Sequence, residues 1–145
     1  MRIMAVDYGD ARTGVAVSDE LATIAGEAWV ISEKNQKAVV SAVAVEAAGR
    51  GVGVIAVGYP KNMNGTAGPR AAICERFAEL LREGLSGLGC EAEVVLWDER
   101  LTTTSAHRIL TDTGSHGKKR KKTVDAVAAS LILEGYLSYL SNNAE

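Results

Sequence analysis

The sequence predicts an α/β fold with a mixed, central five-stranded sheet flanked by helices, in the element order βββαβαβαα. Three observations lead to this prediction. Short apolar and β-branched runs follow one another early in the chain, separated by turn signals. Later apolar runs alternate with helical patterns, as in α/β proteins. The 145 residues, 47% of them hydrophobic, suit a single domain over residues 1–145 with one substantial core.

The first part of the chain predicts three strands. Ile3–Val6 is short and apolar and ends at Asp7, and Thr13–Ser18 alternates and is rich in β-branched residues. Ala28–Ile31 is a third β-compatible run. The short connections between these runs favour an antiparallel meander.

The rest of the chain alternates between strand and helix patterns, which predicts parallel pairing. Pro69 is well placed at the first position of a helix. The segment 112–122 interrupts the periodic pattern and is expected to be a mobile loop. The predicted strands are Gly53–Val57 and Val94–Trp97, and the predicted helices are Asn35–Arg50, Pro69 to about Gly84, Thr102–Leu110 and Thr123 to about Leu140.

Composition excludes several classes of protein. No apolar run reaches 18 residues, so neither a transmembrane helix nor another membrane association is expected. The N-terminus lacks the apolar region of a signal peptide. Cys74 and Cys90 have no spacing typical of a metal site, and two free thiols suit the reducing cytoplasm.

Charge is unevenly distributed, although the formal net charge is only −2. Five of the 16 Lys and Arg residues form one unbroken run, which leaves 11 basic residues against 18 acidic ones elsewhere. A concentrated basic segment on an acidic protein indicates a local contact for a polyanion such as nucleic acid. The run consists of Lys118, Lys119, Arg120, Lys121 and Lys122.

Three acidic residues are candidates for a shared site. Asp7 ends the first predicted strand, Glu99 follows the last one, and Asp125 lies near the start of the final predicted helix. Functional groups of open α/β sheets gather at the carboxyl ends of strands, so adjacent central strands would bring Asp7 and Glu99 together. Clustered carboxylates repel one another unless a cation neutralises them, and oxygen ligands without His or Cys select Mg²⁺ or Mn²⁺. The sequence therefore predicts a site for one or two such ions.

Four motifs in order resemble a known family over almost the whole chain. They are DYGDARTGVAVSD from Asp7, GYPKNMNGT from Gly58, DERLTT from Asp98, and KKRKKTVDAVAASLILEGYL from Lys118. Together they resemble the YqgF/RuvX family of the RNase H-like superfamily. The resemblance implies an RNase H-like fold and a nuclease, either one that matures the 5′ end of precursor 16S ribosomal RNA or a Holliday junction resolvase acting on branched DNA.

The resemblance assigns Asp7, Glu99 and Asp125 to the acidic active site of the family, as catalytic metal ligands. Asp98, on the other side of its strand, is expected to brace the strand end. Arg12 is either a phosphate contact or one half of a surface salt bridge. Arg100 either braces the acids or meets the nucleic-acid backbone. Asn64 stands where relatives often carry Asp, and is interpreted as a turn residue.

The sequence supports two classes of function. One is an Mg²⁺- or Mn²⁺-dependent endonuclease that acts on precursor rRNA or on a DNA junction. The other is a non-catalytic, nucleic-acid-binding ribosome assembly factor. Either a monomer or a homodimer fits the sequence, and cleavage of both strands of a symmetric junction would favour the dimer.

Overall fold

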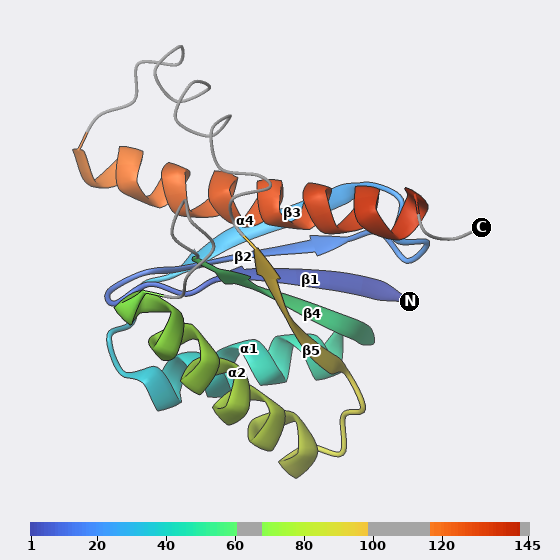
Figure 1. Cartoon of the computed structure of the whole chain (residues 1–145), viewed down its shortest axis with the longest axis horizontal. Helices are drawn as coiled ribbons and strands as arrows, with labels where there is room; N and C mark the ends of the chain where they lie inside the picture. Colours follow the sequence, from blue (N-terminus) through green and yellow to red (C-terminus); the bar gives the residue numbers. More distant parts are fainter. Residues whose placement is uncertain (61–67, 99–116, 143–145) are drawn as a thin grey trace.

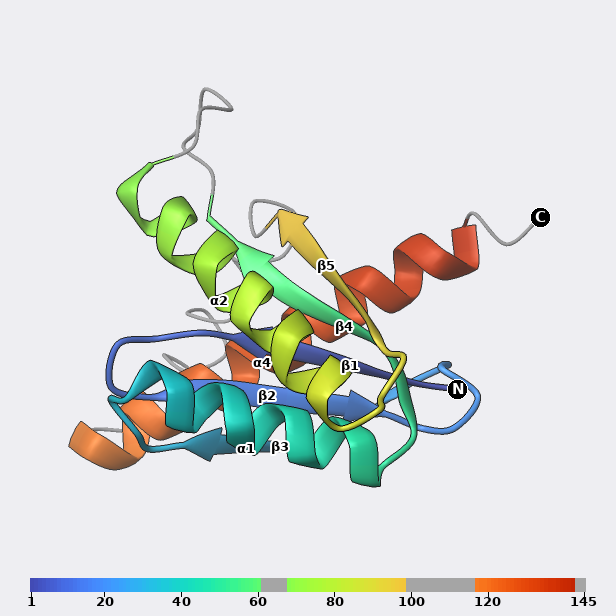
Figure 2. The ribbon, with the colours of Figure 1, turned by 90° about the horizontal axis from the view of Figure 1, so that it is seen from below.

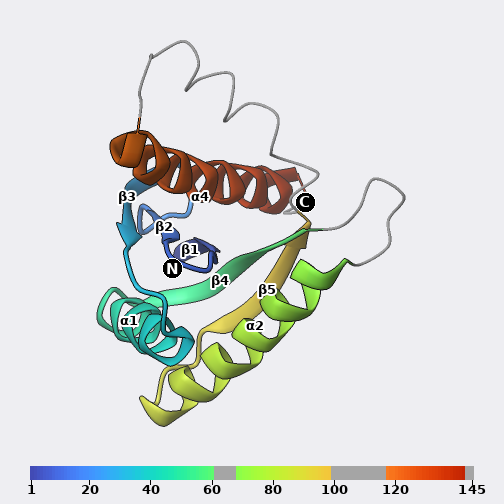
Figure 3. The same cartoon turned by 90° about the vertical axis from the view of Figure 1, so that its left-hand side faces the viewer.

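The computed structural model of the chain describes residues 1–60, 68–98 and 117–142, with residues 117–124 described by their backbone alone. Three layers make up the fold, with a sheet between α4 on one face and α1 and α2 on the other (Figures 1 and 3). The elements are β1 Arg2–Asp7, β2 Thr13–Ser18, β3 Ala25–Ile31, α1 Gln36–Gly49, β4 Val52–Tyr59, α2 Pro69–Gly87, β5 Glu93–Asp98 and α4 Gly117–Asn142.

The described sheet has five strands in the order β3-β2-β1-β4-β5. β2 pairs antiparallel with both β1 and β3, while β4 pairs parallel with both β1 and β5. The predicted mixed sheet, its meander and its parallel half are therefore confirmed. The expected helix over Thr102–Leu110 lies outside the described residues, as do residues 112–116 of the expected loop.

The prediction that Asp7 and Glu99 lie close together assumed that their two strands are adjacent in the sheet, and this assumption is wrong. β1 and β5 are not neighbours, because β4 lies between them and β5 forms the edge of the sheet. The crossover through α1 places β4 directly beside β1, and the next crossover through α2 adds β5 on the outer side of β4. Asp7 and the end of β5 are therefore separated by the width of one strand.

The final helix begins earlier than predicted. α4 starts at Gly117, so the basic run at 118–122 forms its first turns rather than part of a mobile loop. The loop was predicted because this segment interrupts the apolar pattern, but Lys and Arg have high helix propensity and suit the first turns of a helix. Asp125 is consequently the ninth residue of α4, in its third turn, and not in the first turn of the helix.

Two apolar layers hold the helices on the sheet. The layer under α1 and α2 contains large side chains, including the fully buried Phe77, which stacks on Tyr8 with ring centroids 4.3 Å apart. Full burial of such a side chain contributes about 1.5–3 kcal/mol. The layer under α4 contains several alanines, which let this helix come close to the strands. They are Ala5, Ala16, Ala56 and Ala129.

Local signals explain where the other helices begin. The Asn35 side chain caps α1 by accepting a hydrogen bond of 3.0 Å from the Ala38 N–H. Pro69 occupies the start of α2, as predicted. Viewed from below, α1 and α2 run side by side across the same face of the sheet (Figure 2).

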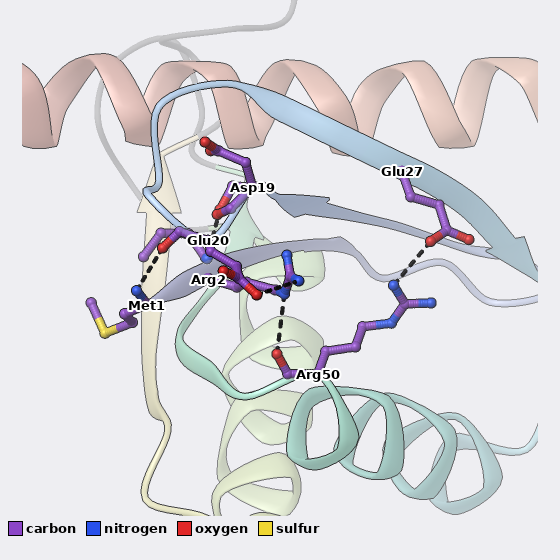
Figure 4. A network of polar contacts seen from close by, with 8 residues as sticks. Met1, Arg2, Asp19, Glu20, Glu27 and Arg50 are labelled. Carbon is purple, nitrogen blue, oxygen red and sulfur yellow. Dashed lines mark hydrogen bonds and ion pairs between the residues drawn. The ribbon is translucent and has the colours of Figure 1, made fainter.

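A network of polar contacts at the surface lies at the end of the sheet that carries the N-terminus (Figure 4). Arg2 pairs with Glu20 at 3.2 Å and donates to the Arg50 carbonyl oxygen. Arg50 in turn pairs with Glu46 and Glu27. The charges at this end satisfy one another at the surface, whereas the opposite end carries the predicted acidic site.

Candidate active site

Asp7 is the last residue of β1 and lies at the carboxyl end of the strand. Alternate residues of β1 face opposite layers, and Ile3 and Ala5 belong to the layer under α4. Asp7 continues this series and is half-buried. Its carboxylate therefore lies on the α4 side of the sheet.

Gly14 allows Asp125 to lie close to Asp7. Gly14 is the cross-strand partner of Asp7 in the β1–β2 pair. A Cβ atom added at Gly14 would overlap the backbone carbonyl oxygen of Asp125 and crowd Ala129. Only glycine permits this approach of β2 and α4. Asp7 and Asp125, which are 118 positions apart in the sequence, thus lie around a single glycine.

The turn between β1 and β2 is equally tight. A Cβ atom at Gly9 would overlap the carbonyl oxygen of Arg12, so the turn closes directly on Arg12. The tight turn places Arg12 directly before β2, within reach of α4.

Arg12 forms an ion pair with Asp125, with Nε and Oδ2 3.3 Å apart. Both side chains are partly buried, with exposed fractions of 33% and 25%. Burial raises the pKa of Asp125 above its ordinary value, and the nearby Arg12 guanidinium acts in the opposite direction. Of the two roles left open for Arg12, the ion pair is present, and its partner is the partly buried candidate residue Asp125.

A second arginine holds the same turn from the other face of the sheet. Arg70, in the first turn of α2, donates to the Tyr8 carbonyl oxygen and to Asp10 Oδ1, each at 2.6 Å. Its guanidinium also lies over the Tyr8 ring, 5.6 Å from the centroid. Sequence analysis missed Arg70, because no local pattern shows that α2 begins beside this turn.

The end of β5 is described only as far as Asp98. Val95 and Trp97 pack in the layer under α4, so alternation places Asp98 on the opposite face from Asp7. Asp98 therefore does not join Asp7 on the α4 side, and its expected role as a brace of the strand end stays a prediction. Glu99 and Arg100 lie outside the described residues.

The basic run precedes Asp125 along α4. Positions 121 and 122 come four and three residues before Asp125, and therefore occupy the same side of the helix. The first turns of α4 thus carry five basic residues shortly before Asp125 in the chain: Lys118, Lys119, Arg120, Lys121 and Lys122.

The donor set suits a hard divalent cation. Asp7 and Asp125 offer carboxylate oxygens, and no His or Cys accompanies them in the described part of the site. Within residues 1–60, 68–98 and 117–142, no group of three or more His, Cys, Asp or Glu side chains could hold a metal ion. The third predicted ligand, Glu99, falls outside these ranges. The oxygen donors of Asp7 and Asp125 fit Mg²⁺ or Mn²⁺ as part of a set.

Three further sequence expectations concern the protein as a whole. Cys74 and Cys90 are both free thiols, as expected. No helix among the described residues is long and apolar enough to cross a membrane. Asn64 lies in the stretch 61–67, outside the described residues.

Comparison with solved structures places this architecture among RuvC-like, RNase H-type α/β proteins. RuvC of Thermus thermophilus, solved in complex with a Holliday junction substrate, matches with a TM-score of 0.57 over 96% of each chain, at 15% identity. The fowlpox virus Holliday junction resolvase matches with a TM-score of 0.52 over 98% of this chain and 99% of its own, also at 15% identity. At such low identity these similarities establish the fold alone.

The family follows from sequence comparison. The model of the family described as "RuvX: Holliday junction resolvase" matches residues 1–139, and the chain belongs to this family. A relative from Bacillus cytotoxicus is 45% identical over 94% of this chain and 98% of its own length. Another, from Carboxydothermus hydrogenoformans, is 41% identical over 99% of this chain and 100% of its own. Both relatives bear the name "Putative pre-16S rRNA nuclease".

Proposed function

We propose that this protein is a metal-dependent endonuclease that hydrolyses phosphodiester bonds in structured RNA, with precursor 16S rRNA as its substrate. The observation that carries the proposal is the close approach of α4 to β2 at Gly14, which sets Asp125 beside Asp7 at the carboxyl end of β1. Relatives more than 40% identical over nearly the whole chain carry the name of this nuclease, which supports the choice of substrate.

Asp7, Asp125 and Glu99 are the residues that would hold one or two Mg²⁺ or Mn²⁺ ions. Such an ion, when bound, lowers the pKa of a coordinated water and stabilises the leaving oxyanion of phosphodiester hydrolysis. The three side chains come from β1, from α4 and from the residue that follows β5. Asp7 and Asp125 thus come from two separate regular elements, which hold side chains in place more firmly than one flexible loop would.

The basic residues supply the affinity for nucleic acid. The run at 118–122 opens α4 and leads directly to Asp125, so a phosphate backbone bound there passes the acidic site. Arg12, and Arg100 beyond β5, add further phosphate contacts. Phosphate contacts release counterions, so binding of RNA falls steeply as salt increases. The chain is poor in aromatic residues, at 5%, and recognition therefore depends on backbone and shape more than on stacked bases.

The test is cleavage of a labelled precursor 16S rRNA fragment and of a synthetic four-way DNA junction, in Mg²⁺, Mn²⁺ or EDTA. Wild type is compared with Asp7→Asn and Glu99→Gln, and with Glu20→Gln as a control, because Glu20 is exposed at the opposite end of the sheet. We expect metal-dependent cutting of the RNA that both site variants lose and the control retains. RNA binding without cutting, unchanged in the variants, would contradict the proposal and favour an assembly factor.

The junction arm of this experiment addresses a second function, resolution of Holliday junctions, which the description of the matching family suggests. Faster cutting of the junction than of the RNA would establish that function instead. A resolvase must cut two symmetric strands, so it would also have to form a homodimer. Size-exclusion chromatography distinguishes this dimer from the monomer that suffices for an RNA nuclease.

We propose a cytoplasmic location for either function, which is consistent with the two free thiols.

A further inference from the structure

Two arginines hold the β1–β2 turn, and their contacts differ in strength. Arg70 makes two hydrogen bonds of 2.6 Å and lies over the ring of Tyr8. Arg12 reaches Asp125 through Nε alone, at 3.3 Å. Charge-assisted hydrogen bonds are usually about 2.7–2.9 Å long, and the strongest arginine–carboxylate pairs use two parallel bonds. Arg70 is therefore a fixed clamp, whereas Arg12 is held by one long bond that can be exchanged.

The partner of Arg12 is one of the proposed metal-holding residues. Asp125 has lost three-quarters of its exposure to solvent, so its ionised carboxylate needs a counter-charge. Arg12 supplies that charge through an interaction with Oδ2. A divalent cation bound to the same oxygen would repel the guanidinium, so the cation and Arg12 compete for Asp125.

A guanidinium displaced from Asp125 would remain beside the site. Gly9 closes the turn tightly on the backbone of Arg12, which limits how far the side chain can move away. Its planar group of N–H donors matches the oxygens of a phosphate group, and arginine stays charged throughout the physiological pH range. A released Arg12 could therefore bind the phosphate of a nucleic-acid strand that lies along the site.

We propose that Arg12 is an exchangeable counter-ion, which neutralises Asp125 when no metal is bound and is released to a substrate phosphate when a divalent cation takes that carboxylate. This inference rests on the proposed function, because it assumes that Asp125 holds a metal ion. It gives the site an order of events, in which metal binding prepares an arginine for RNA. Both roles considered for Arg12 then occur in turn: the ion pair without metal, and the phosphate contact with metal bound.

The first test is the affinity for Mn²⁺, measured by isothermal titration calorimetry without RNA. Arg12→Gln removes the competing charge, so we expect Mn²⁺ to bind about two- to fivefold more tightly, within the range expected for the loss of a partly exposed ion pair. Arg12→Lys keeps the charge and should bind Mn²⁺ like wild type. Arg2→Gln is the matched control, because Arg2 also pairs with a carboxylate at 3.2 Å and is 31% exposed. It removes the same charge away from the site and should leave the affinity unchanged.

The second test is binding of a phosphorothioate-substituted precursor rRNA fragment that resists cleavage. Because Arg12 is engaged with Asp125 in EDTA, Arg12→Gln should bind this RNA like wild type there, but several-fold more weakly in Mg²⁺. If Arg12→Gln lost RNA affinity equally in EDTA and in Mg²⁺, the proposed exchange of Arg12 between Asp125 and phosphate would be wrong.

The outcomes separate this inference from the proposed function. If wild type binds Mn²⁺ and Asp125→Asn does not, but Arg12→Gln binds it with wild-type affinity, then the exchange is wrong and the metal site stands. If wild type binds no Mn²⁺ at all, the metal site is wrong and the exchange fails with it.

Discussion

Asp19 and Asp125 are carboxylates at opposite ends of the same sheet, and their surroundings shift their pKa values in opposite directions. Asp19 follows β2 and accepts hydrogen bonds from Thr23 N, Thr23 Oγ1 and Ile24 N, at 2.7, 2.7 and 3.1 Å. These bonds, led by the one from the Thr23 hydroxyl, lower its pKa to about 2. Burial raises the pKa of Asp125, and a single long contact from Arg12 offsets this effect only in part.

The difference distinguishes an acid that its own turn satisfies from the acid that we propose as a metal ligand. The carboxylate of Asp19 is satisfied by its own turn and stabilises the folded protein. The carboxylate of Asp125 is kept in an environment that disfavours its charge, which is the usual condition of groups that await a ligand. Acidic residues of the same type can therefore be distinguished by their partners, and each prediction below tests this distinction or the geometry that produces it.

The largest effect is expected from Gly14→Ala, because the new Cβ atom would overlap the Asp125 carbonyl oxygen and push α4 away from β2. Overpacking of this kind costs about 1–3 kcal/mol. A displacement of 1 Å in a site can cost roughly a hundredfold in rate, and we expect a loss of that order in RNA cleavage. Urea unfolding and single-turnover cleavage measure the two effects.

Gly49→Ala is the matched control for this substitution. A Cβ atom at Gly49, at the end of α1, would meet nothing within 4 Å. Its stability should stay within about 1 kcal/mol of wild type or increase, because alanine loses less entropy than glycine in a helix. Equal stability and activity of the two variants would show that α4 does not depend on Gly14 for its position.

Arg70→Ala is expected to have the next largest effect. It removes two hydrogen bonds that hold the turn after Asp7, made to the Tyr8 carbonyl oxygen and to Asp10. Mutation of residues that orient metal ligands without touching the metal typically lowers activity ten- to a hundredfold. We therefore expect kcat for RNA cleavage to fall by about tenfold, with little change in KM. Arg76→Ala on the same helix, where Arg76 is 62% exposed and pairs with Glu79, should behave like wild type. A drop in kcat of equal size in both variants would remove the positioning role of Arg70.

Asp125→Asn should not reduce the stability of the metal-free protein. Because the pKa of Asp125 is raised above its unfolded value of about 3.8, the folded protein binds its proton more tightly than the unfolded chain. The ionised carboxylate therefore costs stability at neutral pH, and this cost disappears below the unfolded pKa. Thermal unfolding in EDTA at pH 7 should give an equal or higher Tm for the variant. A clearly lower Tm would mean that the ion pair with Arg12 outweighs burial.

The smallest effect, opposite in sign, is expected for Asp19→Asn. The folded pKa of Asp19, about 2, lies below the unfolded value of 3.8. Its contribution to stability is therefore fully present above pH 4 and is lost as the pH falls towards 2. Wild type should be slightly more stable than the variant at pH 6, and the difference should vanish near pH 2, as measured by urea unfolding across this range. A difference that persists unchanged at pH 2 would contradict the hydrogen-bonded state of this carboxylate.

Local sequence patterns sufficed for much of the fold. Alternation in Thr13–Ser18, the proline at the start of α2 and the alanine-rich pattern of α1 each specify their element through local physics. The antiparallel meander follows from short connections, and the parallel half from the alternation of helices and strands. These features depend on neighbours in the sequence, and for that reason they were predictable.

Features that depend on distant segments were not predictable in the same way. The start of α4 was misplaced because residues 118–122 interrupt the apolar pattern, although Lys and Arg have high helix propensity. The neighbours of β1 depend on the order of crossovers, which no single motif encodes. The contact of Gly14 with the backbone of Asp125 and the clamp by Arg70 join segments more than 50 residues apart. Asp7 and Asp125 were nevertheless identified as candidates, because the acids follow or interrupt apolar patterns.

The most direct test of the account is whether Asp7 and Asp125 hold the same metal ion. Mn²⁺ binding can be followed by electron paramagnetic resonance in wild type, Asp7→Asn, Asp125→Asn and the control Asp19→Asn. The account predicts that both site variants lose most of the binding and that Asp19→Asn retains wild-type affinity. Wild-type affinity in either Asp7→Asn or Asp125→Asn would contradict a shared site at the carboxyl end of β1.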